Sequence, residues 1–201
     1  MPLDAPVITT TQLARSRDTG RAYPPRSGYR QSVATRVQDV EPFAGHSPGQ
    51  ERPLGGYAVL MGAFTAAAAG FGAWLRSSGR EPPERVPPGD LALMTVATHK
   101  ASRLIAKDRV TSTVRAPFTR FEDDAGPSEV SEEARGRGLR RAIGELIICP
   151  YCLGLWVAAA FAAGFVVAPR PTRWVAATLS ALFGADVLQL AYSKAEQQLA
   201  G

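Results

Sequence analysis

The stretch from Leu146 to Ala168, LIICPYCLGLWVAAAFAAGFVVA, decides the fold that this sequence predicts. Its 23 residues carry no charge, and a helix of about 20 apolar residues, rising 1.5 Å per residue, crosses the roughly 30 Å hydrocarbon core of a bilayer. The 22 residues of Leu54–Leu75 are also uncharged, and Trp174–Tyr192 carries one acid, Asp186. These three segments predict a multi-pass membrane protein.

Averaged over all 201 residues, the composition conceals these segments. The mean hydropathy of −0.07 is that of a soluble protein, because polar loops offset the apolar segments, so a window of span length is the better test. A net charge of +5 would fit a nucleic-acid partner. Arginines beside membrane spans fix topology and account for that charge equally well. We therefore expect the lipid bilayer, and no nucleic acid, as the partner.

The first 53 residues predict a disordered cytoplasmic tail. They contain seven prolines and seven arginines but few large apolar side chains, so they cannot bury enough surface to offset the entropy of ordering. The first 25 residues hold no apolar core of a signal peptide. We therefore expect Leu54–Leu75 to act as the insertion signal.

A further segment, Leu91–Ala106, decides how many times the chain crosses. It is 16 residues long and carries His99, Lys100 and Arg103, which is short and charged for a span. An amphipathic helix lying along the membrane interface is the alternative.

The distribution of basic residues favours a crossing. With four spans, the cytoplasmic side holds 16 lysines and arginines against five outside, whereas three spans would place the two arginine-rich regions on opposite sides. We therefore expect an all-α integral protein of the inner membrane, with both termini cytoplasmic. Its membrane domain is 54–201, with spans at 54–75, 91–106, 146–168 and 174–192 and a cytoplasmic loop at 107–145.

The cytoplasmic loop is expected to hold some local structure. Acids come early and arginines late in Ser128–Gly144, an order that suits a helix macrodipole. Val114–Phe118 is expected to be extended, because Pro117 disfavours helix before it.

Cys149 and Cys152 form a CPYC tetrapeptide of the glutaredoxin type. A cysteine before a helix gains thiolate character, and Pro150 suits the first helical position. The pair is therefore a candidate redox site, with Cys149 attacking and Cys152 resolving. It is also half of a metal site, to which His99 or a second copy would add ligands, and a purely structural role stays open. A lone CxxC outside a βαβ unit is a weak signal, and we expect no cofactor.

Asp186 is costly within a span unless it is paired. Lys100 is expected at a similar depth, on a segment running in the opposite direction, and Arg103 about one turn nearer the cytoplasm. We therefore expect an intramembrane ion pair of Asp186 with Lys100 or Arg103. The alternative is a proton or ion relay with His99, as a small proton-coupled transporter would need.

Two surface features predict contacts. Small residues at i+4 spacing on the first span suit close approach by a second copy or a membrane partner: Ala58, Gly62, Ala66 and Gly70. Four arginines just before the third span set topology or bind anionic lipid headgroups: Arg135, Arg137, Arg140 and Arg141.

Three separated motifs follow one another in the second half of the chain. They are Arg103, Leu104, Ile105 and Asp108; Arg115, Pro117 and Phe118; and Gly144, Glu145, Leu146, Cys149, Cys152, Gly154 and Trp156. Their order over Leu91–Tyr192 resembles a bacterial membrane-protein family catalogued as domain of unknown function 1360. The resemblance implies that Leu91–Ala106 is a true span and links some members to sporulation, and it implies no catalytic residue.

Taken together, these features predict a non-enzymatic membrane protein that acts through packing or partner contacts. A membrane thiol redox or metal-binding protein is the first alternative, and a small proton-coupled transporter is the second.

Overall fold

The computed structural model describes residue 46 and residues 52–199. Contacts divide the chain into two units, 1–35 and 36–201. The first unit, like most of the predicted disordered tail at 1–53, lies outside the described residues. Everything below concerns the second unit.

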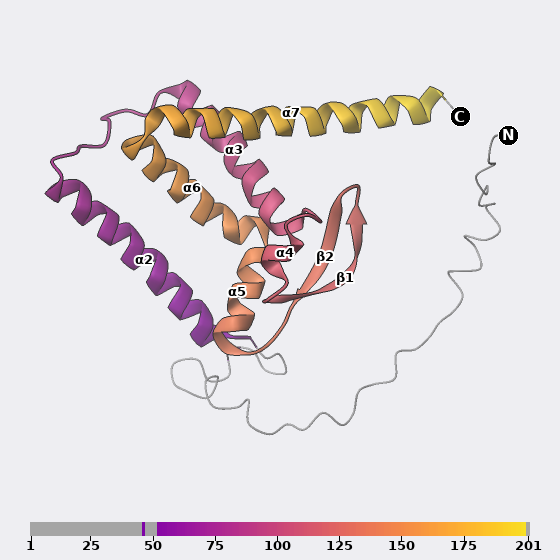
Figure 1. The fold of residues 1–201 in the computed structure, drawn as a ribbon, viewed down its shortest axis with the longest axis horizontal. Coiled ribbons are helices and arrows are strands. Elements are labelled where there is room, and N and C mark those ends of the chain that lie inside the picture. The colour runs from indigo at the N-terminus through magenta and orange to yellow at the C-terminus, as the bar shows by residue number, and fades with distance from the viewer. Residues whose placement is uncertain (1–45, 47–51, 200–201) are drawn as a thin grey trace, which may run out of the picture. The chain divides into compact units, whose positions relative to one another are not determined.

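The described chain is mostly helical, as the sequence predicts, and it also contains one antiparallel hairpin (Figure 1). The elements are α2 (Leu54–Ser77), α3 (Pro88–Lys107), α4 (Ser112–Arg115), β1 (Thr119–Gly126), β2 (Glu129–Ala134), α5 (Gly138–Ile148), α6 (Pro150–Val167) and α7 (Pro169–Leu199). Helices α2, α6 and α7 are long and apolar enough to cross a membrane. Helix α3 fails that test because charged residues interrupt it.

Helix α3 packs against both α6 and α7. Asp90 near the start of α3 pairs with Arg173 near the start of α7, and Lys100 farther along α3 pairs with Asp186 farther along α7. Because the residue numbers rise together, α3 and α7 run in the same direction, and the opposite direction expected from the sequence is wrong.

Helices α2 and α6 also run side by side in one direction. The ring of Phe64 meets that of Trp156 edge to face at 5.2 Å. Beyond the end of α2, Arg80 donates to the carbonyl of Val167 at the end of α6. Since α6 turns directly into α7 at Ala168, the four long helices alternate: α2 and α6 point one way, α3 and α7 the other.

The uncharged stretch that decides the fold is bent. Helix α5 ends at Ile148, α6 begins at Pro150, and Cys149 between them is extended, with φ −102° and ψ 103°. Pro150 causes the break, because its ring disfavours the helical conformation in the preceding residue. Residues 146–148 therefore belong to the separate helix α5, which packs against α2.

The loop between α3 and α5 differs from both local expectations. The predicted helix over Ser128–Gly144 is wrong: the chain forms strand β2 and does not become helical until Gly138. Positive φ values at Gly136 (89°) and Gly138 (55°) interrupt a helix there. The predicted extended Val114–Phe118 is also wrong, because α4 is a helical turn that ends at Arg115.

Candidate functional site

The strongest polar cluster of the described chain is centred on Arg115, at the end of α4. This guanidinium is 0% exposed, and it binds the Glu132 carboxylate through Nε at 3.0 Å and Nη2 at 2.9 Å. It also donates to the carbonyls of Ile105 (2.5 Å) and Asp108 (2.9 Å) and to the Thr111 hydroxyl (2.6 Å). Paired, planar contacts of this kind are the strongest that arginine makes.

Both carboxylate oxygens of Glu132 on β2 also have several hydrogen-bond partners. Its two oxygens also accept hydrogen bonds from Ser112 (2.6 Å) and Thr119 (2.7 Å). Burial alone would raise the pKa of this carboxyl, but the hydrogen bonds from Arg115, Ser112 and Thr119 outweigh burial and lower the pKa to about 2. Both charges are therefore held ionised out of water at neutral pH.

This cluster locks the hairpin to the end of α3. Arg115 bonds α3 and the turn after it, while its partner Glu132 and the Thr119 hydroxyl bring in β2 and β1. We call residues 108–134, held in this way, the hairpin platform. Sequence reasoning found Arg115 only through a family motif, and it placed Glu132 on a helix. The available signal was the alternation of Val130 and Glu132, which both point inward on a strand.

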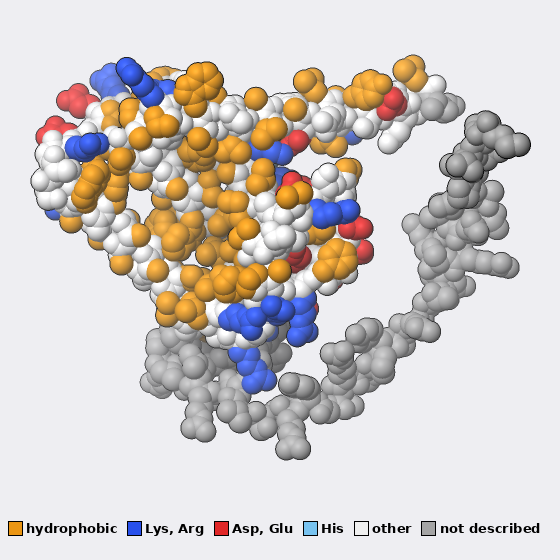
Figure 2. Space-filling view, viewed as in Figure 1, with side chains coloured by type: hydrophobic (Ala, Val, Ile, Leu, Met, Phe, Trp, Pro, Cys, Tyr) orange, Lys and Arg blue, Asp and Glu red, His pale blue; other side chains and the backbone are white. Residues whose placement is uncertain are grey.

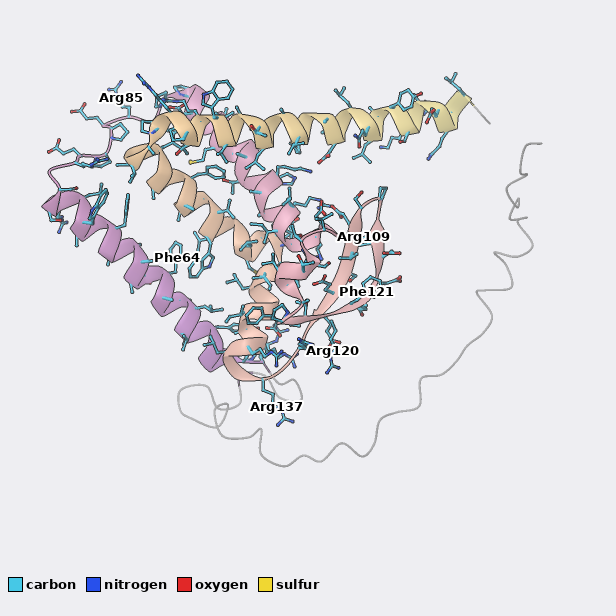
Figure 3. All side chains as sticks on the ribbon, in the orientation of Figure 1. Phe64, Arg85, Arg109, Arg120, Phe121 and Arg137 are labelled. Atoms are coloured by element: carbon cyan, nitrogen blue, oxygen red, sulfur yellow. The ribbon has the colours of Figure 1, made fainter. Side chains whose placement is uncertain are left out.

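The hairpin platform carries large apolar side chains that are exposed. Val110 is 81% exposed, Val114 68% and Phe121 66%, and Figure 3 shows Phe121 on β1. Arg103 joins this region to α3 through a bidentate contact with Glu129, with both distances 2.8 Å. The structure therefore does not bring Arg103 to Asp186.

Lys100 and Asp186 do meet. Nζ of Lys100 lies 2.5 Å from Oδ2 of Asp186, and the side chains are 17% and 49% exposed. The neighbouring His99 packs edge to face on Phe183, with ring centroids 5.3 Å apart. Each of these contacts joins α3 to α7.

The two cysteines lie at the bend between α5 and α6. Cys149 caps α6, and its sulfur accepts the backbone N–H of Cys152 at 3.2 Å. Both thiols are free. Among residues 46 and 52–199, no group of three or more His, Cys, Asp or Glu side chains is arranged to hold a metal ion.

The four arginines at the start of α5 are differently engaged. Arg135 and Arg140 both donate to the carbonyl of Pro117, and Arg141 pairs with Glu145 at 2.9 Å. Arg137 points away from the helices (Figure 3). Figure 3 places Arg137 at the end of the fold where Lys and Arg side chains cluster in Figure 2.

The small-residue stripe on α2 is open in the described structure. A Cβ atom added to Gly62 or Gly70 would meet nothing within 4 Å. Gly56, six residues before Gly62 on the same helix, is closely packed, since an added Cβ would lie 2.6 Å from that of Ala142. Helix α2 thus packs closely only at its start.

Comparison of the sequence with known proteins identifies a family. A protein family of unknown function, DUF1360, matches residues 93–192. The chain belongs to this family. It is also 29% identical over 107 residues to the sporulation protein YjcA of Bacillus subtilis (strain 168), an alignment that covers 52% of this chain and 91% of that protein. No solved structure matches.

The DUF1360 region includes the sites described above but not all of the long helices. It begins within α3 and ends within α7, so it contains the Arg115–Glu132 cluster, both cysteines and the Lys100–Asp186 pair. Helix α2 lies outside it. The family assignment confirms the resemblance seen in the sequence motifs.

Proposed function

We propose that this DUF1360 protein crosses the inner membrane four times, with both termini and the hairpin platform in the cytoplasm. The alternating directions of α2, α3, α6 and α7 support an even number of crossings. Each charged side chain within α3 that would enter the bilayer has a partner, since Lys100 meets Asp186 and Arg103 meets Glu129. Such pairing is what makes a charged span tolerable.

Within that topology we propose a non-enzymatic role in which the hairpin platform is the contact surface for a protein partner. The buried Arg115–Glu132 pair carries this proposal, because it fixes the hairpin rigidly while leaving Phe121 and Val114 mostly exposed. Aromatic side chains are enriched in protein interfaces, and contiguous exposed apolar patches mark contact sites. Because the Bacillus relative is named a sporulation protein, we extend the proposal to a role in a process such as sporulation.

Photocrosslinking in living cells tests the contact surface. A photoreactive residue in place of Phe121 should give one discrete adduct, whereas the same residue in place of Val59, an exposed position on α2, should not give that adduct. Loss of the adduct on Glu132→Gln would tie it to the rigid platform. A folded protein that yields no adduct from Phe121, Val114 or Val110 would reject the role.

A thiol redox function is the second candidate. The N–H of Cys152 already donates to the Cys149 sulfur, a contact that stabilises a thiolate. Alkylation rates measured against pH in the Cys149→Ser and Cys152→Ser variants test it. Cys149 should be alkylated faster than Cys152 at neutral pH, because Cys149 precedes the helix and Cys152 lies in its first turn. Equal alkylation rates of the two thiols would leave only a structural role.

The transporter alternative has less support from the contacts. Asp186 has Lys100 as an ion-pair partner, and His99 contacts the Phe183 ring. A proton-flux assay in vesicles with Asp186→Asn remains its direct test, with loss of flux as the outcome that would revive it.

A further inference from the structure

Two free thiols lie together at the bend where α5 meets α6 (Figure 1). Cys149 precedes α6, and Cys152 lies in its first turn. The sulfur of Cys149 is 3.2 Å from the backbone nitrogen of Cys152, and the two side chains interact with each other. Because the chain contains two cysteines, all of its thiol groups meet at this one place, where a single metal ion can contact both sulfurs.

A zinc site would be incomplete around these two sulfurs. Zinc takes four ligands in structural sites, and three protein ligands with a water in catalytic ones. His99, the third ligand considered from the sequence, packs instead on Phe183 where α3 meets α7. Glu145, which lines the same cavity as Cys152, already accepts a hydrogen bond and an ion pair. In the part of the chain that the structure describes, no third side chain of the metal-binding types joins the pair.

Two thiolates are a complete ligand set for Cu(I). This ion is soft, and cysteine thiolates are among the ligands that select it over harder metal ions. Its filled d shell imposes no geometry, so two sulfurs on opposite sides of the ion satisfy it without a third donor. Cys149 is half-buried and Cys152 is exposed, so an ion can reach the pair from solvent and leave again.

We propose that Cys149 and Cys152 together bind one Cu(I) ion, each thiol releasing its proton as its sulfur binds the metal. This site goes beyond the contact role of the hairpin platform and does not depend on it. In the proposed topology the pair lies at the cytoplasmic end of α6, where a reducing environment keeps both thiols free. An accessible ion held by two sulfurs exchanges readily with other thiols, so the site suits transfer of Cu(I) rather than its permanent storage.

Titration of the full chain in detergent with Cu(I), under anaerobic reducing conditions and in competition with bicinchoninate, tests the site. One Cu(I) should bind per chain. Cys149→Ser and Cys152→Ser should each weaken binding by more than about a hundredfold, because loss of one of two direct ligands exceeds the 10- to 100-fold cost of losing an outer-shell partner. His99→Asn is the matched control and should leave the affinity unchanged, since the proposed site takes no ligand from α3.

Three results would overturn this assignment. Affinity for Cu(I) that either cysteine variant retains, in protein that elutes like the unsubstituted chain, would remove the sulfurs as ligands. Displacement of Cu(I) by an equal concentration of Zn²⁺ would replace the two-sulfur site with one of higher coordination. One metal ion for every two chains would show a four-thiolate site shared between copies. Serine differs from cysteine by one atom, so these variants change the donor while keeping the shape of the bend.

Discussion

The Glu132→Gln substitution tests the buried cluster most sharply. Glutamine keeps the shape of the side chain but leaves Arg115, which is 0% exposed, without a counter-charge. The pKa of Glu132 falls from 4.5 to about 2 in the folded protein, which corresponds to about 3 kcal/mol at 1.36 kcal/mol per unit. Removing one partner from a buried salt bridge typically lowers the stability of a folded protein by about 3–5 kcal/mol.

Hydrogen exchange of the β1 and β2 backbone amides in detergent measures this loss. A cost of about 3 kcal/mol should accelerate exchange about a hundredfold. Glu129→Gln is the matched control, because it removes a bidentate carboxylate of the same hairpin whose partner, Arg103, is 49% exposed. Exposed pairs contribute about 1 kcal/mol or less, so exchange should change less than about sixfold.

The pH dependence should follow from the lowered pKa. Because the folded-state value lies below the unfolded one, the stabilisation from Glu132 is fully present above about pH 4.5 and is lost as pH falls from there toward 2. Glu132→Gln should lack this component. Exchange in Glu132→Gln that stays within sixfold of the unsubstituted protein, or an unaltered acid profile, would refute the reasoning.

Two further substitutions probe the helix contacts. Asp186→Leu should lower the thermal stability of the protein in detergent by leaving Lys100 unpaired, and Lys100→Met/Asp186→Leu should recover part of the loss; equal losses in the single and double variants would show no coupling. Gly56→Ala should destabilise the protein by about 1–3 kcal/mol, because its Cβ would lie 2.6 Å from that of Ala142. Gly62→Ala, with nothing within 4 Å, should be neutral, and equal effects of the two substitutions would contradict the packing of α2 on α5.

The long apolar elements could be predicted because length and hydropathy are local properties. Segments 54–75 and 174–192, and residues 150–167 of the segment 146–168, fall on helices that are apolar enough to cross a membrane. The ends were less predictable: α7 extends to Leu199, and Pro150 divides one segment into two helices. Helix α3 could not be identified by hydropathy at all, since its charged residues find their partners elsewhere in the chain.

The hairpin platform could not be predicted because its stability is tertiary. The sequence EVSEEA over 129–134 fits a strand or a polar helix, and the contact of Glu132 with Arg115 selects the strand. The same contact explains why Val114 and Arg115 are helical despite Pro117. Lys100 was predictable as a partner for Asp186, but Arg103 was not predictable as a partner for Glu129.

Reporter fusions measure the topology on which the account depends. Fusions after Pro88, Gly126 and Gly201 should report outside, inside and inside, because α3 then crosses the membrane and leaves the hairpin platform in the cytoplasm. A cytoplasmic signal from the Pro88 fusion would contradict the four crossings and would return α3 to the membrane interface.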